Sequence, residues 1–300
     1  MRVEFAQAIL DNDEAHNNQL FITGDLGYMA LEQVRDRLGE RFINAGVAEQ
    51  NMVTVAAALA SQGFVPWVYS ISPFVTLRPY EQIRNDVCLH NLPVKLVGNG
   101  GGYGYGIMGA THHNLEDIGA MRILPNMQVV VPFSSQDVFD AVQWMLQSPR
   151  PNYLRLNMAA KTDFPIPPFG QWRKIKEGTK AVVAGTGPVV ANLLALPADL
   201  LEGLEIWLVS IFPVTEVPDA FVASVEEKKK LLTIEEHNGQ CGLNETLAAL
   251  LLGKLNTAVG FKALYANGYP SGRYGDQRWH QEENGLAGAS LTNTISAFLS

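Results

Sequence analysis

Short apolar runs alternate along this chain with segments of helical periodicity, and this alternation is the feature that most restricts the fold. Strand-like runs occupy residues 19–23, 41–44, 65–71, 94–97, 128–131 and 151–156, and helical patterns occupy residues 1–18, 32–38, 77–90 and 136–147. Strands that alternate with helices form a mostly parallel sheet with helices on both faces. We therefore predict an open α/β unit over residues 1–161.

A second unit of the same kind follows a break in the pattern. Residues 162–178 are rich in proline and glycine, which is typical of a linker. Beyond it, strand-like runs at residues 180–185, 205–210, 231–235 and 261–265 accompany a helical pattern at 243–252. The sequence thus predicts two open, mostly parallel α/β domains, residues 1–161 and 179–300.

Composition limits the partners and the compartment. A net charge of −8 argues against nucleic acid or an anionic membrane surface as a partner. No uncharged apolar run is long enough to span a bilayer, and the N-terminal residues lack a signal-peptide core. Cys88 and Cys241 have no metal-ligand spacing, which is typical of a protein from a reducing cytoplasm.

Residues 42–63 combine a short strand, a turn and an apolar helix with alanine and valine at helical spacing. Glu49 is the single acid at the start of this helix. An acid beside so many apolar side chains is partly desolvated, which is typical of a functional carboxylate. Spacing alone is also explained by an ordinary acidic residue in the first helical turn, where the helix dipole favours it.

The glycine-rich segment 98–109 follows a strand, and residues 104–109 match the pattern G-x-G-x-x-G. The dinucleotide interpretation needs an acidic residue about 20 positions later, and Asp117 comes too soon. The segment is more typical of a flexible substrate loop, in which Tyr103 and Tyr105 supply aromatic faces and hydroxyl groups.

Two adjacent histidines, His112 and His113, precede Glu116 and Asp117. Neighbouring histidines on one loop point to different sides, and no third ligand has matching spacing, so the sequence does not predict a metal site in this chain. A histidine that titrates near neutral pH can instead exchange protons with a substrate.

Several ordered blocks together resemble the transketolase family, which uses thiamine diphosphate. They are GVAEQNM at 46–52, THH at 111–113, EDIGAMRILPNM at 116–127 and YLRL at 153–156, with a weaker block, TIEEHNGQCGLNE, at 233–245. The resemblance implies that residues 1–161 are a pyrimidine-binding domain and that residues 179–300 are a transketolase C-terminal domain. It also implies an interface or fold role for residues 235–237.

The resemblance assigns roles to particular residues. It implies that Glu49 contacts the aminopyrimidine ring of the cofactor and that His112 relays protons at the substrate, which makes these two residues the expected catalytic pair. The remaining expected cofactor contacts are Asp25, Ile71 and Phe74, and the remaining expected substrate contacts are Tyr103, Tyr105, Met108 and His113. Ile71 stands where the family usually has phenylalanine.

Three positions depart from the family pattern at the substrate end. Gly100, Met108 and Met158 stand where sugar-phosphate transketolases have histidine, aspartate and arginine. A bound phosphate needs cationic or backbone donors. We therefore expect a substrate that is not a simple phosphorylated ketose.

The family holds the cofactor's diphosphate through a metal ion bound by GDG and NN motifs. Residues 24–26 read GDL, with no NN motif after them. The resemblance therefore implies that a companion subunit holds the diphosphate and Mg²⁺, and that this chain forms a homodimer within a heterotetramer. The expected reaction transfers a two-carbon unit from a ketose-type donor to an aldehyde or sugar acceptor.

Two alternatives remain open from the sequence. The chain could be the β-type subunit of a 2-oxo acid dehydrogenase or of a pyruvate-using synthase. The missing sugar-phosphate contacts keep this interpretation open, whereas the GVAEQNM and THH blocks favour the transketolase side. It could also be a degenerate regulatory or scaffolding partner, against which the presence of Glu49 and His112 speaks.

Overall fold

The strands of the computed structural model, which describes residues 1–27 and 29–300, form two sheets. The first sheet contains β1 (Gln19–Thr23), β2 (Phe42–Asn44), β3 (Val65–Ile71), β4 (Lys95–Asn99), β5 (Gln128–Val130), β6 (Asn152–Leu156) and β10 (Ile211–Phe212). The second sheet contains β7 (Trp172–Lys176), β8 (Ala181–Thr186), β9 (Leu204–Val209), β11 (Lys230–Asn238) and β12 (Gly260–Ala266).

The helices connect these strands in chain order. The first unit has α1 (Arg2–Asp11), α2 (Glu32–Leu38), α3 (Glu49–Ser61), α4 (Ser72–Thr76), α5 (Tyr80–Gln82), α6 (Asp117–Arg122) and α7 (Ser135–Gln147). The second has α8 (Ala191–Leu194), α9 (Ala198–Glu202), α10 (Asp219–Lys228), α11 (Leu243–Leu252), α12 (Gln277–Glu283) and α13 (Gly288–Leu299). None of the helices in the described ranges has the length and apolar character needed to cross a membrane.

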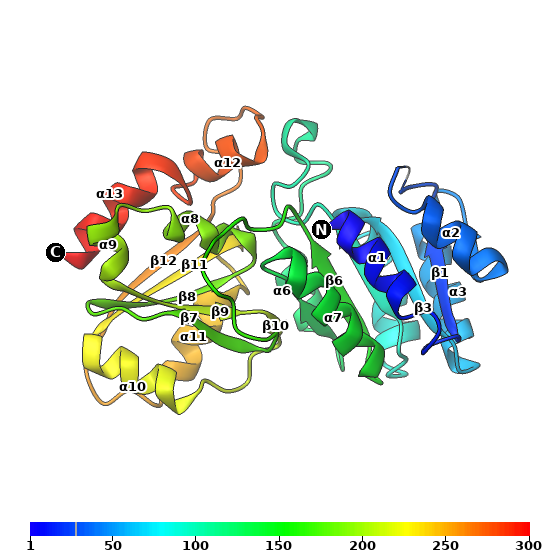
Figure 1. Ribbon diagram of the computed structural model, residues 1–300, viewed down its shortest axis with the longest axis horizontal. Coiled ribbons are helices and arrows are strands. Elements are labelled where there is room, and N and C mark those ends of the chain that lie inside the picture. Colours follow the sequence, from blue (N-terminus) through cyan, green and yellow to red (C-terminus); the bar gives the residue numbers. More distant parts are fainter. Residues whose placement is uncertain (28) are drawn as a thin grey trace.

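Strand order and direction confirm the predicted fold class. The orders are β10-β5-β6-β4-β3-β1-β2 and β12-β11-β8-β9-β7, and the two sheets lie side by side (Figure 1). Only the edge pairs β10–β5 and β7–β9 are antiparallel among the described strand pairs. The inner strands β1 and β8 are buried along their whole length, as expected for parallel strands that are covered on both faces.

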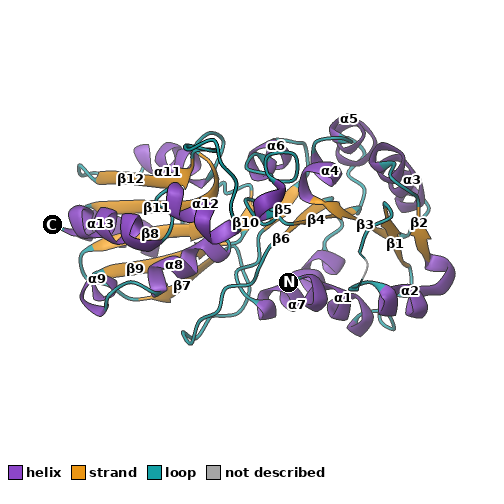
Figure 2. Ribbon diagram, turned by 90° about the horizontal axis from the view of Figure 1, so that it is seen from above, coloured by secondary structure: helices purple, strands orange, loops and turns teal. Residues whose placement is uncertain are grey.

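Helices cover both faces of each sheet. In the first unit, α1, α2 and α7 lie on one face and α3 to α6 on the other (Figure 2). On the first face Phe5 packs among Phe21, Trp67 and Tyr69. On the other face, small apolar side chains of α3, such as Ala56, belong to the core cluster.

The two units are joined by packing as well as by chain connection. Strand β10, which follows β9 of the second unit, pairs with β5 of the first. One apolar core cluster also continues from Met52 in the first unit to Phe212 and Leu247 in the second.

The segment predicted as a linker, residues 162–178, contains the edge strand β7, whose side chains alternate between buried and partly exposed positions. Its charged residues and the prolines before it explain why the sequence pattern did not indicate a strand.

Candidate active site

The predicted site residues gather at one edge of the first sheet because they follow parallel strands. Glu49 follows β2, Phe74 follows β3, and the glycine-rich loop with His112 follows β4. Strands β1, β2, β3, β4 and β6 all run in the same direction. Ligands of open α/β sheets bind at this carboxyl edge.

Glu49 is the first residue of α3 and is 5% exposed. Its carboxylate accepts hydrogen bonds from Nη1 of Arg78, which lies 3.1 Å from each oxygen. The same guanidinium lies over the ring of Phe74, with Cζ 3.7 Å from the ring centroid. Arg78 is not among the site residues that the sequence predicts. A single arginine directly after the mostly apolar segment 71–77 could have indicated a partner for the carboxylate of Glu49.

His112 lies beside Phe74 and Tyr105. Its ring packs edge-on against Phe74 at a centroid distance of 5.3 Å and lies 5.8 Å from the ring of Tyr105. Nδ1 of His112 and the hydroxyl of Thr111 are 2.9 Å apart. Nε2 of His112 has no hydrogen-bond partner among the described residues.

The other expected cofactor contacts are Asp25, Ile71 and Phe74. The backbone N–H of Asp25 donates to the side chain of Asn44 at 3.0 Å, so Asp25 lies between the ends of β1 and β2. Ile71 is 9% exposed at the end of β3, whereas Phe74 is half-buried. Phe74 therefore presents more of its surface to a ligand than Ile71 does.

The glycine-rich loop is shaped by the side chain of Tyr105. The hydroxyl of Tyr105 accepts a hydrogen bond from Asn99 at 2.9 Å. A Cβ atom at Gly100, whose φ is +75°, would lie 2.3 Å from the Tyr105 ring. A side chain at position 100 is therefore incompatible with this position of Tyr105. Tyr105 itself is partly exposed and Met108 is exposed.

Tyr103 does not lie where a substrate contact was predicted. Its side chain is fully buried, and its hydroxyl donates to the carbonyl oxygen of Gly268 in the second domain at 2.6 Å. Its ring stacks on His280 at a centroid distance of 4.7 Å. Tyr103 thus supports the loop from inside, because the second domain offers its ring an apolar surface and its hydroxyl an acceptor.

His113 is also turned away from a substrate. It is 4% exposed, and its ring nitrogens lie 2.8 Å from the carbonyl oxygen of Gly106 and 3.0 Å from the hydroxyl of Tyr269. Burial lowers the pKa of His113 to about 4, so the ring is neutral near neutral pH. The predicted substrate contact of His113 is therefore replaced by a positioning contact between the loop and the second domain.

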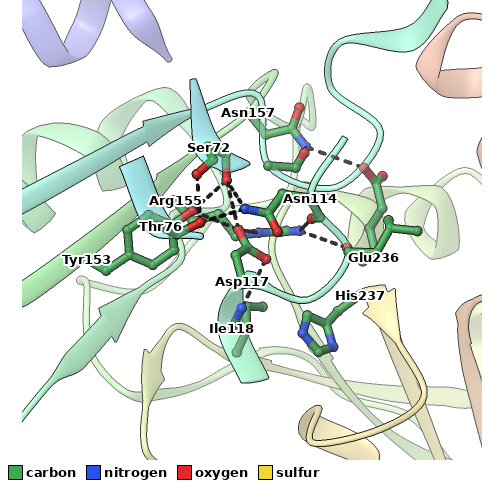
Figure 3. A network of polar contacts seen from close by, with 12 residues as sticks. Ser72, Thr76, Asn114, Asp117, Ile118, Tyr153, Arg155, Asn157, Glu236 and His237 are labelled. Carbon is green, nitrogen blue, oxygen red and sulfur yellow. Dashed lines mark hydrogen bonds and ion pairs between the residues drawn. The ribbon is translucent and has the colours of Figure 1, made fainter. Parts of the chain in front are cut away.

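A buried polar network connects residues at the ends of several strands of the first domain with the second domain (Figure 3). Asp117 accepts hydrogen bonds from Arg155 Nε at 2.8 Å, from the Tyr153 hydroxyl at 2.7 Å and from the Ser72 hydroxyl at 3.2 Å. Nη2 of Arg155 donates to the carbonyl oxygen of Glu236 at 2.9 Å. The network therefore joins strands and loops of the first domain to β11 of the second.

Glu236 holds the loop directly. Its carboxylate accepts a hydrogen bond from the backbone N–H of Tyr103 at 2.7 Å, and it also accepts from the amides of Gln277 and Gln281. Burial raises the pKa of Glu236. Its neighbour Glu235 accepts from two backbone N–H groups at the start of α11 in its own domain. Within this segment, Glu236 thus contacts the first domain and Glu235 contacts the second.

Comparisons with known proteins define the class of this chain. Residues 8–160 match the family "Transketolase, pyrimidine binding domain", and residues 170–276 match "Transketolase, C-terminal domain". The chain therefore belongs to the transketolase family, whose enzymes depend on thiamine diphosphate.

Individual proteins that resemble this chain indicate which members of the family it is similar to. The chain is 30% identical over 219 residues to one of the subunits of the apulose-4-phosphate transketolase of Actinobacillus succinogenes, covering 71% of this chain and 70% of that protein. It is 28% identical to the 1-deoxy-D-xylulose-5-phosphate synthase of Clostridium perfringens, covering 72% of this chain and 36% of that protein. A solved split gene transketolase, described as an inactive beta4 tetramer, matches with a TM-score of 0.81 at 24% identity, over 99% of this chain and 96% of that one. This last match shows the fold.

The described residues suit one end of thiamine diphosphate. Glu49 is a buried carboxylate, and Arg78 contacts both this carboxylate and the ring face of Phe74. A carboxylate and an aromatic face around one place suit a flat ring whose nitrogen can share a proton, such as an aminopyrimidine. The diphosphate end needs a metal ion, and the described part of the chain brings together no group of three or more His, Cys, Asp or Glu side chains able to hold one. The fit is therefore to the pyrimidine end of the cofactor.

Proposed function

We propose that this chain is the pyrimidine-binding subunit of a two-subunit transketolase-like enzyme of the cytoplasm. The enzyme transfers a two-carbon unit from a ketose-type donor to an aldehyde or sugar acceptor. The observation that carries this proposal is the arrangement of Glu49, Phe74 and His112 at the carboxyl edge of the first sheet, with Glu49 5% exposed and His112 against the edge of Phe74.

Each of these residues has a task that its position permits. Glu49 binds a ring nitrogen of the aminopyrimidine, and Phe74 and Ile71 pack on the ring. When bound, thiamine diphosphate supplies the chemistry that breaks and forms the carbon–carbon bond. His112 exchanges protons with the substrate through Nε2, and the second domain restrains the loop that carries this histidine.

The companion subunit supplies the rest of the site. In this proposal it holds the diphosphate and Mg²⁺, and two copies of each chain form a heterotetramer. One relative is named as a single subunit of its transketolase, and another is a beta4 tetramer. The name of the first protein supports an enzyme divided into subunits. The description of the second supports self-association of a chain of this type.

Cofactor binding tests this division. We expect calorimetric titration of thiamine diphosphate and Mg²⁺ into the isolated chain to give little heat, because the chain offers contacts only to the pyrimidine. The same titration of the two-subunit complex should show saturable binding that chelation of Mg²⁺ removes. Tight, Mg²⁺-dependent binding by the isolated chain contradicts the proposal.

The proposal for the substrate rests on the residues at positions 100, 108 and 158. Gly100 cannot accept a side chain without displacing Tyr105, and Met108 and Met158 are exposed apolar residues. None of them offers a charged donor to a phosphate. We therefore propose a donor or acceptor other than a simple phosphorylated ketose. In this proposal, any contact to a phosphate group comes from the companion subunit.

Met158→Arg should restore a phosphate contact. A charge-assisted hydrogen bond contributes about 1.5–3 kcal/mol, so we expect kcat/KM for the pair xylulose 5-phosphate and ribose 5-phosphate to rise by about tenfold or more in the two-subunit complex. The matched control is Ile123→Arg, since Ile123 and Met158 are both 66% exposed and Ile123 follows the end of α6. Efficient use of this pair by the unmodified complex contradicts the substrate proposal.

A second candidate is a synthase that uses pyruvate as the donor. The similarity to 1-deoxy-D-xylulose-5-phosphate synthase favours it. The two candidates differ in one measurement, because only the synthase releases carbon dioxide from pyruvate when an aldehyde acceptor is added to the two-subunit complex.

A further inference from the structure

Arg78 lies between the two residues to which we assign the aminopyrimidine. One guanidinium nitrogen is 3.1 Å from both carboxylate oxygens of Glu49. The guanidinium carbon lies 3.7 Å from the centroid of the Phe74 ring, which places the group over the ring face. The arginine side chain is 46% exposed and the glutamate side chain 5%, so the arginine reaches inward from the surface.

The guanidinium and the aminopyrimidine share the features that this place recognises. A guanidinium is planar, carries N–H donors in its plane and stacks on aromatic faces. An aminopyrimidine is also planar, and its ring nitrogen can share a proton with a carboxylate in the plane of the ring. Both groups therefore suit a carboxylate at one edge and an aromatic ring at one face.

We propose that Arg78 is an internal substitute for the aminopyrimidine ring, which it replaces in the chain without cofactor and to which it gives way when the cofactor binds. The inference rests on the proposed function of Glu49. It assigns Arg78 to the cofactor site, where it sets the affinity for the pyrimidine.

The surroundings of Glu49 and Arg78 explain why Arg78 binds the carboxylate without the cofactor and why it can leave when the cofactor binds. A buried carboxylate without a cationic or hydrogen-bonding partner is strongly disfavoured, so Glu49 needs Arg78 while the pyrimidine is absent. An ion pair with one half-exposed partner is weak enough to be exchanged. Arg78 also follows α4, next to the exposed Leu77, so its side chain can turn to solvent without disturbing the sheet.

Removing the guanidinium should strengthen pyrimidine binding. If Arg78 occupies the place about nine-tenths of the time, the measured affinity is reduced about tenfold, because only the free fraction binds. We expect Arg78→Met to bind 4-amino-5-hydroxymethyl-2-methylpyrimidine about tenfold more tightly than the unmodified chain, in ligand-observed NMR titrations of the isolated chain. Arg78→Lys, which keeps the charge but not the flat shape, should lie between the two.

The matched control is Arg84→Met, because Arg84 is exposed and hydrogen-bonds to its neighbour Asn85. It should leave binding unchanged. Thiamine diphosphate titrated into the two-subunit complex should show the same order of affinities. Equal or undetectable pyrimidine binding in Arg78→Met and the unmodified chain, with both folded by circular dichroism, overturns the inference.

A double variant separates this inference from the proposed function. In the Arg78→Met background, Glu49→Gln should weaken pyrimidine binding about tenfold or more, since it removes the carboxylate that both groups use. If binding is unchanged, the assignment of Glu49 fails, and the inference with it. If Glu49→Gln alone weakens cofactor binding to the complex while Arg78→Met has no effect, the proposed function stands and the inference fails.

Discussion

Glu49→Gln is expected to lower the turnover of the two-subunit complex by about 10²–10⁴-fold, the range that a positioned acid or base contributes. The amide keeps the size and planarity of the carboxylate but loses the charge and the ability to accept or share a proton at the pyrimidine ring. Steady-state kinetics with saturating cofactor measure the effect. Since Glu49 begins α3 and is nearly buried, urea unfolding of the isolated chain should be measured as well.

Glu81→Gln is the matched control. Glu81 lies in α5, is exposed and has no charged partner among the described residues, so the same substitution there should change neither turnover nor unfolding. Turnover of Glu49→Gln within about threefold of the unmodified complex would falsify the proposed role. It would also favour the regulatory or scaffolding partner that the sequence left open.

Much of the fold could be predicted because parallel strands are buried on both faces and therefore stand out as continuous apolar runs. β1 and β3 are of this kind. The sequence predicts β7 only as part of a linker, because an edge strand needs no such run. Trp172–Lys176 carries three basic residues after a proline-rich segment. Its place beside β9 is decided by pairing with a strand that lies later in the chain.

The site divides along similar lines. Glu49 and His112 belong to contiguous motifs that follow strands, so the sequence indicates both their type and their edge of the sheet. Arg78 belongs to no motif, and its contact with Glu49 depends on the turn after α4. Glu49, His112 and Arg78 all lie in the first domain, so the order of its strands along the chain still indicates where they are placed.

Tyr103 and His113 show what the sequence could not provide. Tyr103 contacts a carbonyl group 165 positions later, and His113 contacts a hydroxyl group 156 positions later. Glycine-rich loops have no periodicity that would indicate which tyrosine turns inward. The second domain decides this by presenting Glu236 to the backbone of Tyr103 and His280 to its ring. The C-terminal domain thereby determines the shape of the loop that carries His112.

The pair formed by Arg155 and Asp117 is expected to be the most sensitive point of this junction. Their side chains are 3% and 0% exposed and 2.8 Å apart. Removing one partner of a buried ion pair typically costs about 3–5 kcal/mol because the other charge stays buried without compensation. Arg155→Met should therefore lower the free energy of unfolding by about that amount in urea titrations, and it also frees the carbonyl oxygen of Glu236.

An exposed ion pair with the same distance between nitrogen and oxygen provides the control. Arg278 and Glu282 are also 2.8 Å apart, but their side chains are 52% and 50% exposed. Exposed pairs contribute about 0–1 kcal/mol, so Arg278→Met should cost less than about 1 kcal/mol.

The double variant Asp117→Asn/Arg155→Met removes both charges, and it should be more stable than Arg155→Met alone, because the remaining Asn can still bond to Tyr153 and Ser72, which both contact Asp117. Equal losses for Arg155→Met and Arg278→Met would show that burial does not strengthen the pair. A double variant less stable than Arg155→Met would show that the hydrogen bonds of Asp117, rather than its charge pairing, account for its contribution to stability.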